Sequence, residues 1–398
     1  MQPLVLSAST AVSAMGRGKA ATLDALRARR TGLRPCDWGG VEAGYIGRVD
    51  GVEEYALPEA LARFECRNNR LADMALHTDG FADAVLAAKE RHGAARVAVV
   101  LGTSTSGVQA SEDAFRGRDA EGKLPPGFDY EHTQDLFSVG RYVRDALGLR
   151  GPALVVSTAC ASSAKSFIDA HHLIESGLCD AAVVGGVDSL CRMTLRGFAS
   201  LELISDEPCR PCDADRRGIS IGEAAGFALL ERADRAPGDP EGGRVALLGY
   251  GASSDGYHMS APHPRGAGAV GAMRAALDRA GLAPDGVDYV NLHGTGTRAN
   301  DAMEDMAVTE VFGTATPCSS TKGWSGHTLG ACGILEAVIA EACIRDGLVP
   351  GCLGVRDLDP AFRSDVAVEN RPAPVRRVLS NSFGFGGINC SLIFGPAP

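Results

Sequence analysis

Short apolar runs rich in β-branched residues alternate along the chain with alanine-rich stretches. The clearest runs are 96–101, 153–156 and 181–184, and each is followed closely by Gly, Ser or Thr. Such runs are typical of buried strands that deliver loops to one edge of a sheet. Because helical segments separate these strands, the pattern predicts a layered α/β fold.

Residues 235–244 interrupt this alternation with two prolines and three glycines, a composition typical of a linker. A strand pattern restarts at 245–248. Each half of the chain supplies strand, glycine turn and helix in a similar order, although no residue-level repeat is visible. We therefore predict a duplicated architecture with two halves, residues 1–240 and 241–398.

Composition narrows the class of protein. The chain has 398 residues, 45% hydrophobic and 22% charged, which predicts a large folded core. Its net charge of −10 argues against a nucleic-acid partner, which would require a basic excess. The sequence contains no apolar run of bilayer-spanning length, and its first residues lack the basic start of a signal peptide. We expect a cytoplasmic protein without a nucleic-acid or membrane partner.

Twelve cysteines are dispersed through the chain rather than grouped in a compact disulfide framework, so most should be buried thiols. Cys209 and Cys212 form a C-x-x-C pair. A tetrahedral zinc site needs a second pair of ligands, and the neighbouring sequence offers neither cysteines nor a histidine for it. We therefore expect no bound metal.

Cys160 lies in a run of small residues between an apolar strand at 154–156 and a helix that ends near Gly177. At a helix start, free backbone N–H groups and the positive helix end favour a thiolate and lower the pKa of a nucleophilic thiol. The alternative is a small buried cysteine with a purely structural role. The small neighbours favour the nucleophile, because they leave space for a substrate beside the sulfur.

Two further glycine-rich loops at strand ends carry histidines. Residues 289–297 present His293, and residues 319–330 present Lys322 and His327. Either histidine alone fits a hydrogen-bonded core position, and a lysine is by default a surface residue. Two histidine loops beside a candidate nucleophile indicate a catalytic site, because the glycines let a substrate approach the backbone.

Phe383 and Phe385 stand among glycines in the segment 380–389 near the end of the chain. This segment fits a tight turn packed by the two aromatic rings. It fits equally well a mobile gate that supplies backbone N–H groups to the site.

Together the loops resemble the elongating β-ketoacyl-acyl-carrier-protein synthases, the Cys-His-His condensing enzymes of the thiolase-like superfamily. The resemblance covers most of the chain, and its motifs are 158–163, 211–218, 255–259, 293–297 with Asn300 and Asp301, 322–330 and 383–387. It implies a thiolase-like five-layer αβαβα fold built from two similar halves. It also implies a homodimer whose interface shapes the acyl pocket.

The resemblance implies a decarboxylative condensation. Cys160 would take an acyl group from the phosphopantetheine arm of an acyl carrier protein, and the backbone N–H groups of Cys160 and Phe385 would form an oxyanion hole. His293 and His327 would then stabilise the enolate formed when malonyl carrier protein loses carbon dioxide. The substrates arrive on the carrier, so no permanently bound cofactor is expected.

Supporting roles follow from the same resemblance. Lys322 would organise the site through Asp301 and Glu336, and Phe385 would act as the gate. Further positions are implied as follows: Thr295 and Thr297 bind the pantetheine arm, and Thr105 and Phe198 line the acyl pocket.

Some stretches depart from the family pattern. The start, 4–16, lacks the usual Gly-x-Gly turn, and Cys212 replaces a common aromatic residue. The connector 205–209 is short and acidic where several relatives carry a basic docking stretch for the acidic carrier protein. Arg67 and Arg70 are the predicted replacement, and the alternative is that both lie on a solvated helix face.

Two histidines favour the elongating class, because initiating relatives use Asn for one of them. The alternative function is a non-catalytic or half-active partner subunit of a ketosynthase heterodimer, similar to a chain-length factor. Cys160 argues for an active subunit. Fatty-acid elongation and a specialised polyketide or polyene pathway both remain open.

Overall fold

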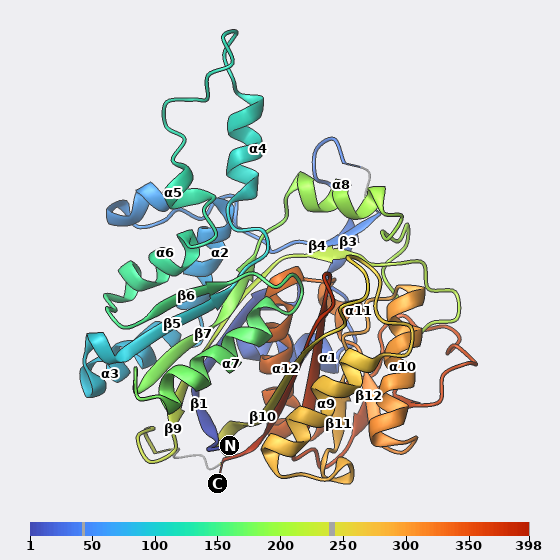
Figure 1. The fold of residues 1–398 in the computed structure, drawn as a ribbon. Helices are drawn as coiled ribbons and strands as arrows, with labels where there is room; N and C mark the ends of the chain where they lie inside the picture. The colour runs from blue at the N-terminus through green and yellow to red at the C-terminus, as the bar shows by residue number, and fades with distance from the viewer. Residues whose placement is uncertain (42–43, 239–242, 398) are drawn as a thin grey trace.

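The computed structural model describes residues 1–41, 44–238 and 243–397 (Figure 1). Each half of the chain contributes five main strands, the sheet of that half, to a continuous 12-stranded sheet. The two-residue strand at 16–17 also pairs at the N-terminal half, and the one at 365–366 forms the edge of the C-terminal half. From the outer edge inward, the strands of the N-terminal half are β6 (Ala153–Val156), β5 (Val97–Gly102), β7 (Ala181–Asp188), β9 (Ala224–Arg232) and β1 (Leu4–Ser13). Those of the C-terminal half are β12 (Pro317–Ser319), β11 (Tyr289–Asn291), β16 (Val378–Gly384), β17 (Ile388–Pro396) and β10 (Val245–Ser254).

The two sheets have the same topology. When the strands of each half are numbered in chain order, both sheets read 3-2-4-5-1. In both, the second strand pairs parallel with the third and the fourth, and the fifth pairs antiparallel with the fourth and the first. Strands β1 and β10 pair antiparallel and join the sheets. The predicted strands are confirmed, and so is an architecture of two similar halves.

The helices complete five layers. Helices α7 (Ser162–Glu175) and α12 (Cys332–Asp346) touch each other between the two sheets. Because α12 contacts strands of both sheets, most of its residues are buried, which explains why most of its sequence is apolar. The outer helices are α2 (Arg67–Leu76), α3 (Phe81–His92) and α6 (Ser138–Leu147) on the N-terminal half, and α9 (Ala267–Ala280) and α10 (Arg298–Phe312) on the C-terminal half.

Smaller elements surround this frame. Helix α1 (Gly18–Arg27) packs on α12, and α4 (Val108–Arg116) and α8 (Arg192–Ser200) lie toward the top of the view in Figure 1. The remaining short strands and α-helices are β2 (Gly16–Arg17), β3 (Leu33–Pro35), β4 (Tyr45–Gly47), β8 (Ile221–Gly222), β13 (Leu348–Val349), β14 (Asp365–Val366), β15 (Arg371–Pro372), α5 (Tyr130–Thr133) and α11 (Lys322–Ser325).

The predicted linker falls between the end of β9 at Arg232 and the start of β10 at Val245. Residues 239–242, and with them the predicted boundary between residues 240 and 241, lie outside the described residues, so that boundary stays a prediction. All twelve cysteines are free thiols. No helix in the described ranges has both the length and the apolar character needed to cross a bilayer.

Candidate active site

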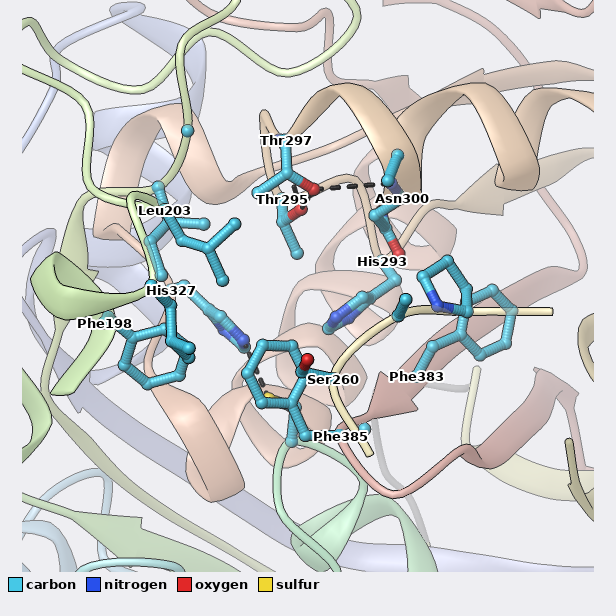
Figure 2. A pocket seen from close by; sticks show the side chains of 18 of the residues that line it. Phe198, Leu203, Ser260, His293, Thr295, Thr297, Asn300, His327, Phe383 and Phe385 are labelled. Atoms are coloured by element: carbon cyan, nitrogen blue, oxygen red, sulfur yellow. Dashed lines mark hydrogen bonds between the residues drawn. The ribbon is translucent and has the colours of Figure 1, made fainter. Parts of the chain in front are cut away.

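The carboxyl ends of β6, β11, β12 and β16 lead into four loops that meet around one cavity of about 530 Å³ (Figure 2). Parallel strands place such loops at a common edge, as the sequence pattern predicts. Cys160, His293 and His327 converge at the inner end of the cavity, and their sulfur and ring nitrogens lie within 4.8 Å of one another. All three side chains are buried.

Cys160 sits in the turn between β6 and α7. Ala159, the residue before it, has a left-handed backbone with φ of 49°, which a small side chain tolerates best. The loop after β16 approaches this turn closely, since a Cβ on Gly384 would lie 2.7 Å from the carbonyl oxygen of Thr158. Glycine at position 384 therefore lets the Phe385 loop reach the nucleophile.

The resting state of the thiol differs from the prediction. Burial raises the pKa of Cys160 to about 12, although Lys322 and the backbone N–H groups of Phe385 and Cys160 act in the opposite direction. Cys160 also precedes the first turn of α7 instead of lying within it. The predicted lowering by the helix end is wrong, because desolvation of the sulfur outweighs it. The thiol is neutral at neutral pH and needs a base when it reacts.

His327 can act as the base for the Cys160 thiol. Its Nε2 lies 3.0 Å from the Sγ of Cys160, and its backbone is fixed by a 2.7 Å bond from its N–H to the Ser220 carbonyl. Burial and the nearby charge of Lys322 hold the pKa of His327 well below its usual value. A neutral imidazole can accept the thiol proton, which an imidazolium cannot.

His293 is held through its backbone, which leaves its ring in the cavity. The N–H groups of His293 and Gly294 each donate a 2.8 Å hydrogen bond to the carboxylate of Glu304. The ring packs edge-on against His327, with 5.2 Å between centroids, and lies 5.8 Å from the Phe383 ring. Burial, Lys322 and His327 together lower its pKa well below the usual value.

Glu304 is a functional residue that the sequence reasoning missed. It lies on α10 three residues after Asp301, so both carboxylates share one helix face. A second acidic residue at this spacing, in a helix that follows a histidine loop, was the available signal. Burial raises the pKa of Glu304 to about 7.

Lys322 is fully buried, so the surface alternative is wrong for it. Its Nζ donates a 2.6 Å hydrogen bond to Glu336 on α12. Burial disfavours the charged lysine, but Glu336 and the other nearby groups outweigh that cost, so the pKa of Lys322 is raised. Glu336 thus holds Lys322 in its charged form, and this charge helps to lower the pKa of both histidines.

Asp301 does not pair with Lys322 among the described residues, contrary to the prediction. Its carboxylate accepts hydrogen bonds from the backbone N–H groups of Cys212 and Gly296, at 3.0 and 3.2 Å. It therefore joins the 211–218 loop to the loop that carries Thr295. Only the Glu336 part of the expected Lys322 network is present.

Thr295 and Thr297 line the cavity above the histidines (Figure 2). Their hydroxyls lie 2.9 Å apart, and the Thr297 hydroxyl accepts a hydrogen bond from the N–H of Asn300, which caps α10. Phe198, Phe383 and Phe385 also line the cavity. The rings of Phe198 and Phe385 lie 5.5 Å apart, and Phe385 is among the exposed large apolar side chains.

Family comparison agrees with this geometry. A model of the β-ketoacyl synthase N-terminal domain matches residues 3–236, and one of the β-ketoacyl synthase C-terminal domain matches residues 245–356. The chain belongs to the β-ketoacyl synthase family. It is therefore a condensing enzyme of the acyltransferase class, and the structural counterpart of the family's Cys-His-His set is the cluster of Cys160, His293 and His327.

Relatives of this β-ketoacyl synthase span most of its length. It is 37% identical to 3-oxoacyl-[acyl-carrier-protein] synthase 2 of Rhizobium meliloti (strain 1021) over 74% of this chain and 73% of that protein. It is 36% identical to nodulation protein E of Rhizobium sp. (strain N33) over 78% and 81%. Among solved structures, the ketosynthase ApeO in complex with its chain length factor ApeC, from Xenorhabdus doucetiae, aligns with a TM-score of 0.90. The identity is 39%, covering 100% of this chain and 98% of that one.

Thr105, predicted to line the acyl pocket of the synthase, lies elsewhere. Thr105 is not among the cavity-lining residues of the described chain; its buried hydroxyl donates a 2.8 Å hydrogen bond to Asp188. Asp188 also accepts hydrogen bonds from the N–H groups of Ser104 and Gly330, so it joins the loop after β5 to the His327 loop. The role of Thr105 is to anchor that loop.

The predicted docking role of Arg67 is contradicted. Its side chain is 7% exposed, and it pairs with the fully buried Glu223 at 2.6 Å and with Glu53. Arg70 donates to Glu65 and to the backbone carbonyls of Val52 and Glu53. Arg67 is bound inside the protein, so neither the docking nor the solvated-face interpretation describes it, whereas the Arg70 guanidinium is partly exposed and already paired with Glu65.

Proposed function

We propose that this synthase elongates an acyl group held on Cys160 with malonyl units carried on the phosphopantetheine arm of an acyl carrier protein. The single observation behind this proposal is the convergence of a neutral thiol, two neutral imidazoles and two backbone N–H groups at the inner end of one cavity. The arm brings the substrates, so the chain needs no resident cofactor of its own.

In the first step, Sγ of Cys160 attacks the carbonyl carbon of the acyl thioester while its proton moves to Nε2 of His327. The backbone N–H groups of Cys160 and Phe385 stabilise the oxyanion of the tetrahedral intermediate. The bond to the carrier sulfur then breaks, and that sulfur takes the proton back from His327. Because the thiol has a pKa of about 12, proton transfer has to accompany attack.

In the second step, the malonyl carboxylate leaves as carbon dioxide, and its bonding electrons form an enolate on the thioester. His293 and, in its Nε2–H tautomer, His327 donate hydrogen bonds to the enolate oxygen, and the carbanion attacks the acyl carbonyl on Cys160. The C–S bond to Cys160 breaks, and the thiolate takes up one proton from solvent to restore the neutral thiol. Lys322 supports this step by keeping both histidines in the neutral form.

A second chain is part of the proposal. Strand β6 ends the sheet of the N-terminal half, and among the described strands its outer side is unpaired. Leu154 on this strand is exposed, and an exposed apolar edge strand is a surface that another chain covers. We propose a homodimer, with a ketosynthase-like partner as the alternative. The alternative is supported by the relative ApeO, which was solved with its chain length factor.

The thiol inventory supports a reducing compartment for the enzyme. All twelve cysteines are free, and most of them are buried. Free thiols in such number persist where glutathione and thioredoxin keep them reduced. We propose that the enzyme works in the cytoplasm.

Intact-protein mass after incubation with a panel of acyl carrier proteins tests the proposal. We expect an acyl adduct that disappears when malonyl carrier protein is added, together with release of a β-ketoacyl product. Cys160→Ala should abolish the adduct. Cys332→Ala is the matched control, because the Cys332 thiol lies 3.1 Å from the carbonyl oxygen of Cys160 and should not carry the acyl group. An adduct retained in Cys160→Ala, or no adduct from any chain, contradicts catalysis and favours the partner-subunit role.

A further inference from the structure

Two arginines at the mouth of the cavity have guanidinium groups without a partner among the described residues. Arg217 and Arg298 both line the cavity and both are exposed. Neither side chain takes part in a hydrogen bond or an ion pair with any described residue. This separates them from Arg67 and Arg70, whose guanidinium groups pair with glutamates of the same chain.

The buried Arg216 brings these two arginines together. It immediately precedes Arg217, and its guanidinium donates to the carbonyl of Arg298 at 3.2 Å and to that of Thr297 at 3.3 Å. Its own charge is taken up by Asp359 at 2.6 Å. One buried side chain thus links the chain next to Arg217 to the backbone at Arg298, so both exposed arginines are held at the same mouth of the cavity.

The position of Arg217 and Arg298 at the cavity mouth determines which part of a bound substrate lies beside them. Arg298 begins α10 directly after Thr297, whose hydroxyl faces the cavity above the histidines (Figure 2). A thioester that reaches Cys160 along this cavity must have its carrier outside the mouth. The acidic residues among the lining are Glu202 and Asp255, and the Asp255 carboxylate accepts hydrogen bonds from Asn389 and the backbone of His263.

The negative net charge of the chain makes a local positive site important for binding an acidic protein. The chain has a net charge of −10, so an acidic protein is repelled by the molecule as a whole and needs a local positive site to dock. Arginine is suited to this, because its planar fork binds carboxylates with two parallel hydrogen bonds.

We propose that Arg217 and Arg298 form the docking site for carboxylates on an acidic acyl carrier protein, in the role first predicted for Arg67 and Arg70. This inference rests on the proposed function for the identity of the partner. The ligand is the carrier's protein surface, and the phosphate of its arm is the competing source of negative charge.

Binding of fluorescently labelled holo carrier proteins tests the proposal without requiring catalysis. The variant Arg217→Glu/Arg298→Glu should weaken the Kd roughly 10-fold at low salt and flatten its dependence on salt. The matched control is Arg235→Glu/Arg376→Glu, which changes the net charge equally. Both control residues are exposed and lie at the opposite edge of the sheets, one after β9 and the other before β16. Equal weakening in the two variants, or no change in either, overturns the proposal, as does a wild type that binds none of the carriers.

Loading of Cys160 distinguishes the two sources of charge. The preference for acyl carrier protein over acyl-phosphopantetheine should fall roughly 10-fold in the docking variant, in proportion to the loss of binding. If loading from acyl-phosphopantetheine falls equally while loading from acyl-pantetheine does not, the arginines bind the arm phosphate and the docking proposal is wrong. Failure of wild-type protein to load from acyl-pantetheine would instead count against the proposed function, with carrier binding still measurable.

Discussion

The two halves of the molecule share one strand order, yet equivalent loops do different work. The loop after β5, the second strand of the N-terminal half, is tied down through Thr103, Ser104 and Thr105, whose side chains all bond Asp188. The loop after β11, the second strand of the other half, is held through its backbone by Glu304. Because only the backbone is anchored there, the ring of His293 is left to face the substrate.

The loops after the third strand of each half also differ in function. Strand β6 leads through Cys160 into α7, and β12 leads through Lys322 and His327 into α12. Ser166 and Glu336 stand at matching places, each four residues after the first residue of its helix. The duplicated frame provides pairs of equivalent positions, and the chemistry arises where the two members of a pair differ.

Breaking the buried charge pair should have the largest effect. Lys322→Met leaves Glu336 uncompensated in the core, so we expect a loss of about 3–5 kcal/mol in the free energy of unfolding. Lys322→Met/Glu336→Leu should regain most of that stability without regaining condensation. Ser166→Ala, at the matching place on α7, should cost only about 1 kcal/mol. Urea unfolding measures all three, and a single variant as stable as the double variant would contradict the pairing.

The second test compares the loops after β5 and β11. His293→Ala removes a donor to the enolate, so condensation should slow by about 10²–10³-fold while acyl loading continues. Ser104 is likewise the second residue after its strand, and Ser104→Ala should leave condensation within about 3-fold while lowering stability by about 1 kcal/mol. Single-turnover assays separate loading from condensation. Equal rates in the two variants would mean that the halves do not divide the chemistry.

The smallest expected effect is a pH dependence at the anchor of the His293 loop. The folded-state pKa of Glu304, about 7, lies above its usual value, so the folded protein binds the proton more tightly than the unfolded chain does. The stability from Glu304 is fully present below the usual pKa and is lost as the pH rises through about 7. Between about pH 5.5 and about pH 8 we expect a loss of about 2 kcal/mol that Glu304→Gln does not show. Identical slopes in urea unfolding for both proteins would contradict it.

The sequence was sufficient for the features that local pattern controls. Cys160, His293 and His327 were predicted because small residues and glycines mark loops that a substrate can approach, and the β-branched runs at 97–101 and 181–184 marked strands. Which polar residues are buried in the folded protein was harder to predict from the sequence. Helix α2 contains Arg67, Asn68, Asn69 and Asp73, and its polar sequence favours an exposed face, yet these residues are buried. Partners far along the chain, such as Glu223, satisfy them, and no local pattern reveals that pairing.

The Cys160 pKa shows a different limit. A helix start can be recognised from the sequence, and its effect on a thiol has a known direction. Desolvation depends on how tightly the Phe385 loop and α12 close over the sulfur, which only the assembled fold determines. The larger of the two opposing effects was therefore the one that the sequence did not show.

The order of the strands has a consequence for synthesis on the ribosome. All five strands of the N-terminal sheet have been made by Arg232, before β10 begins at Val245, so this sheet can assemble while the rest of the chain is still being translated. Strand β10 can pair with the free edge of β1 soon afterwards, but helix α12 is made much later, and until then the inner face of α7 lacks its partner helix. The nascent chain therefore exposes apolar core surface for the time needed to add about a hundred residues. We expect chaperones to bind it during that time.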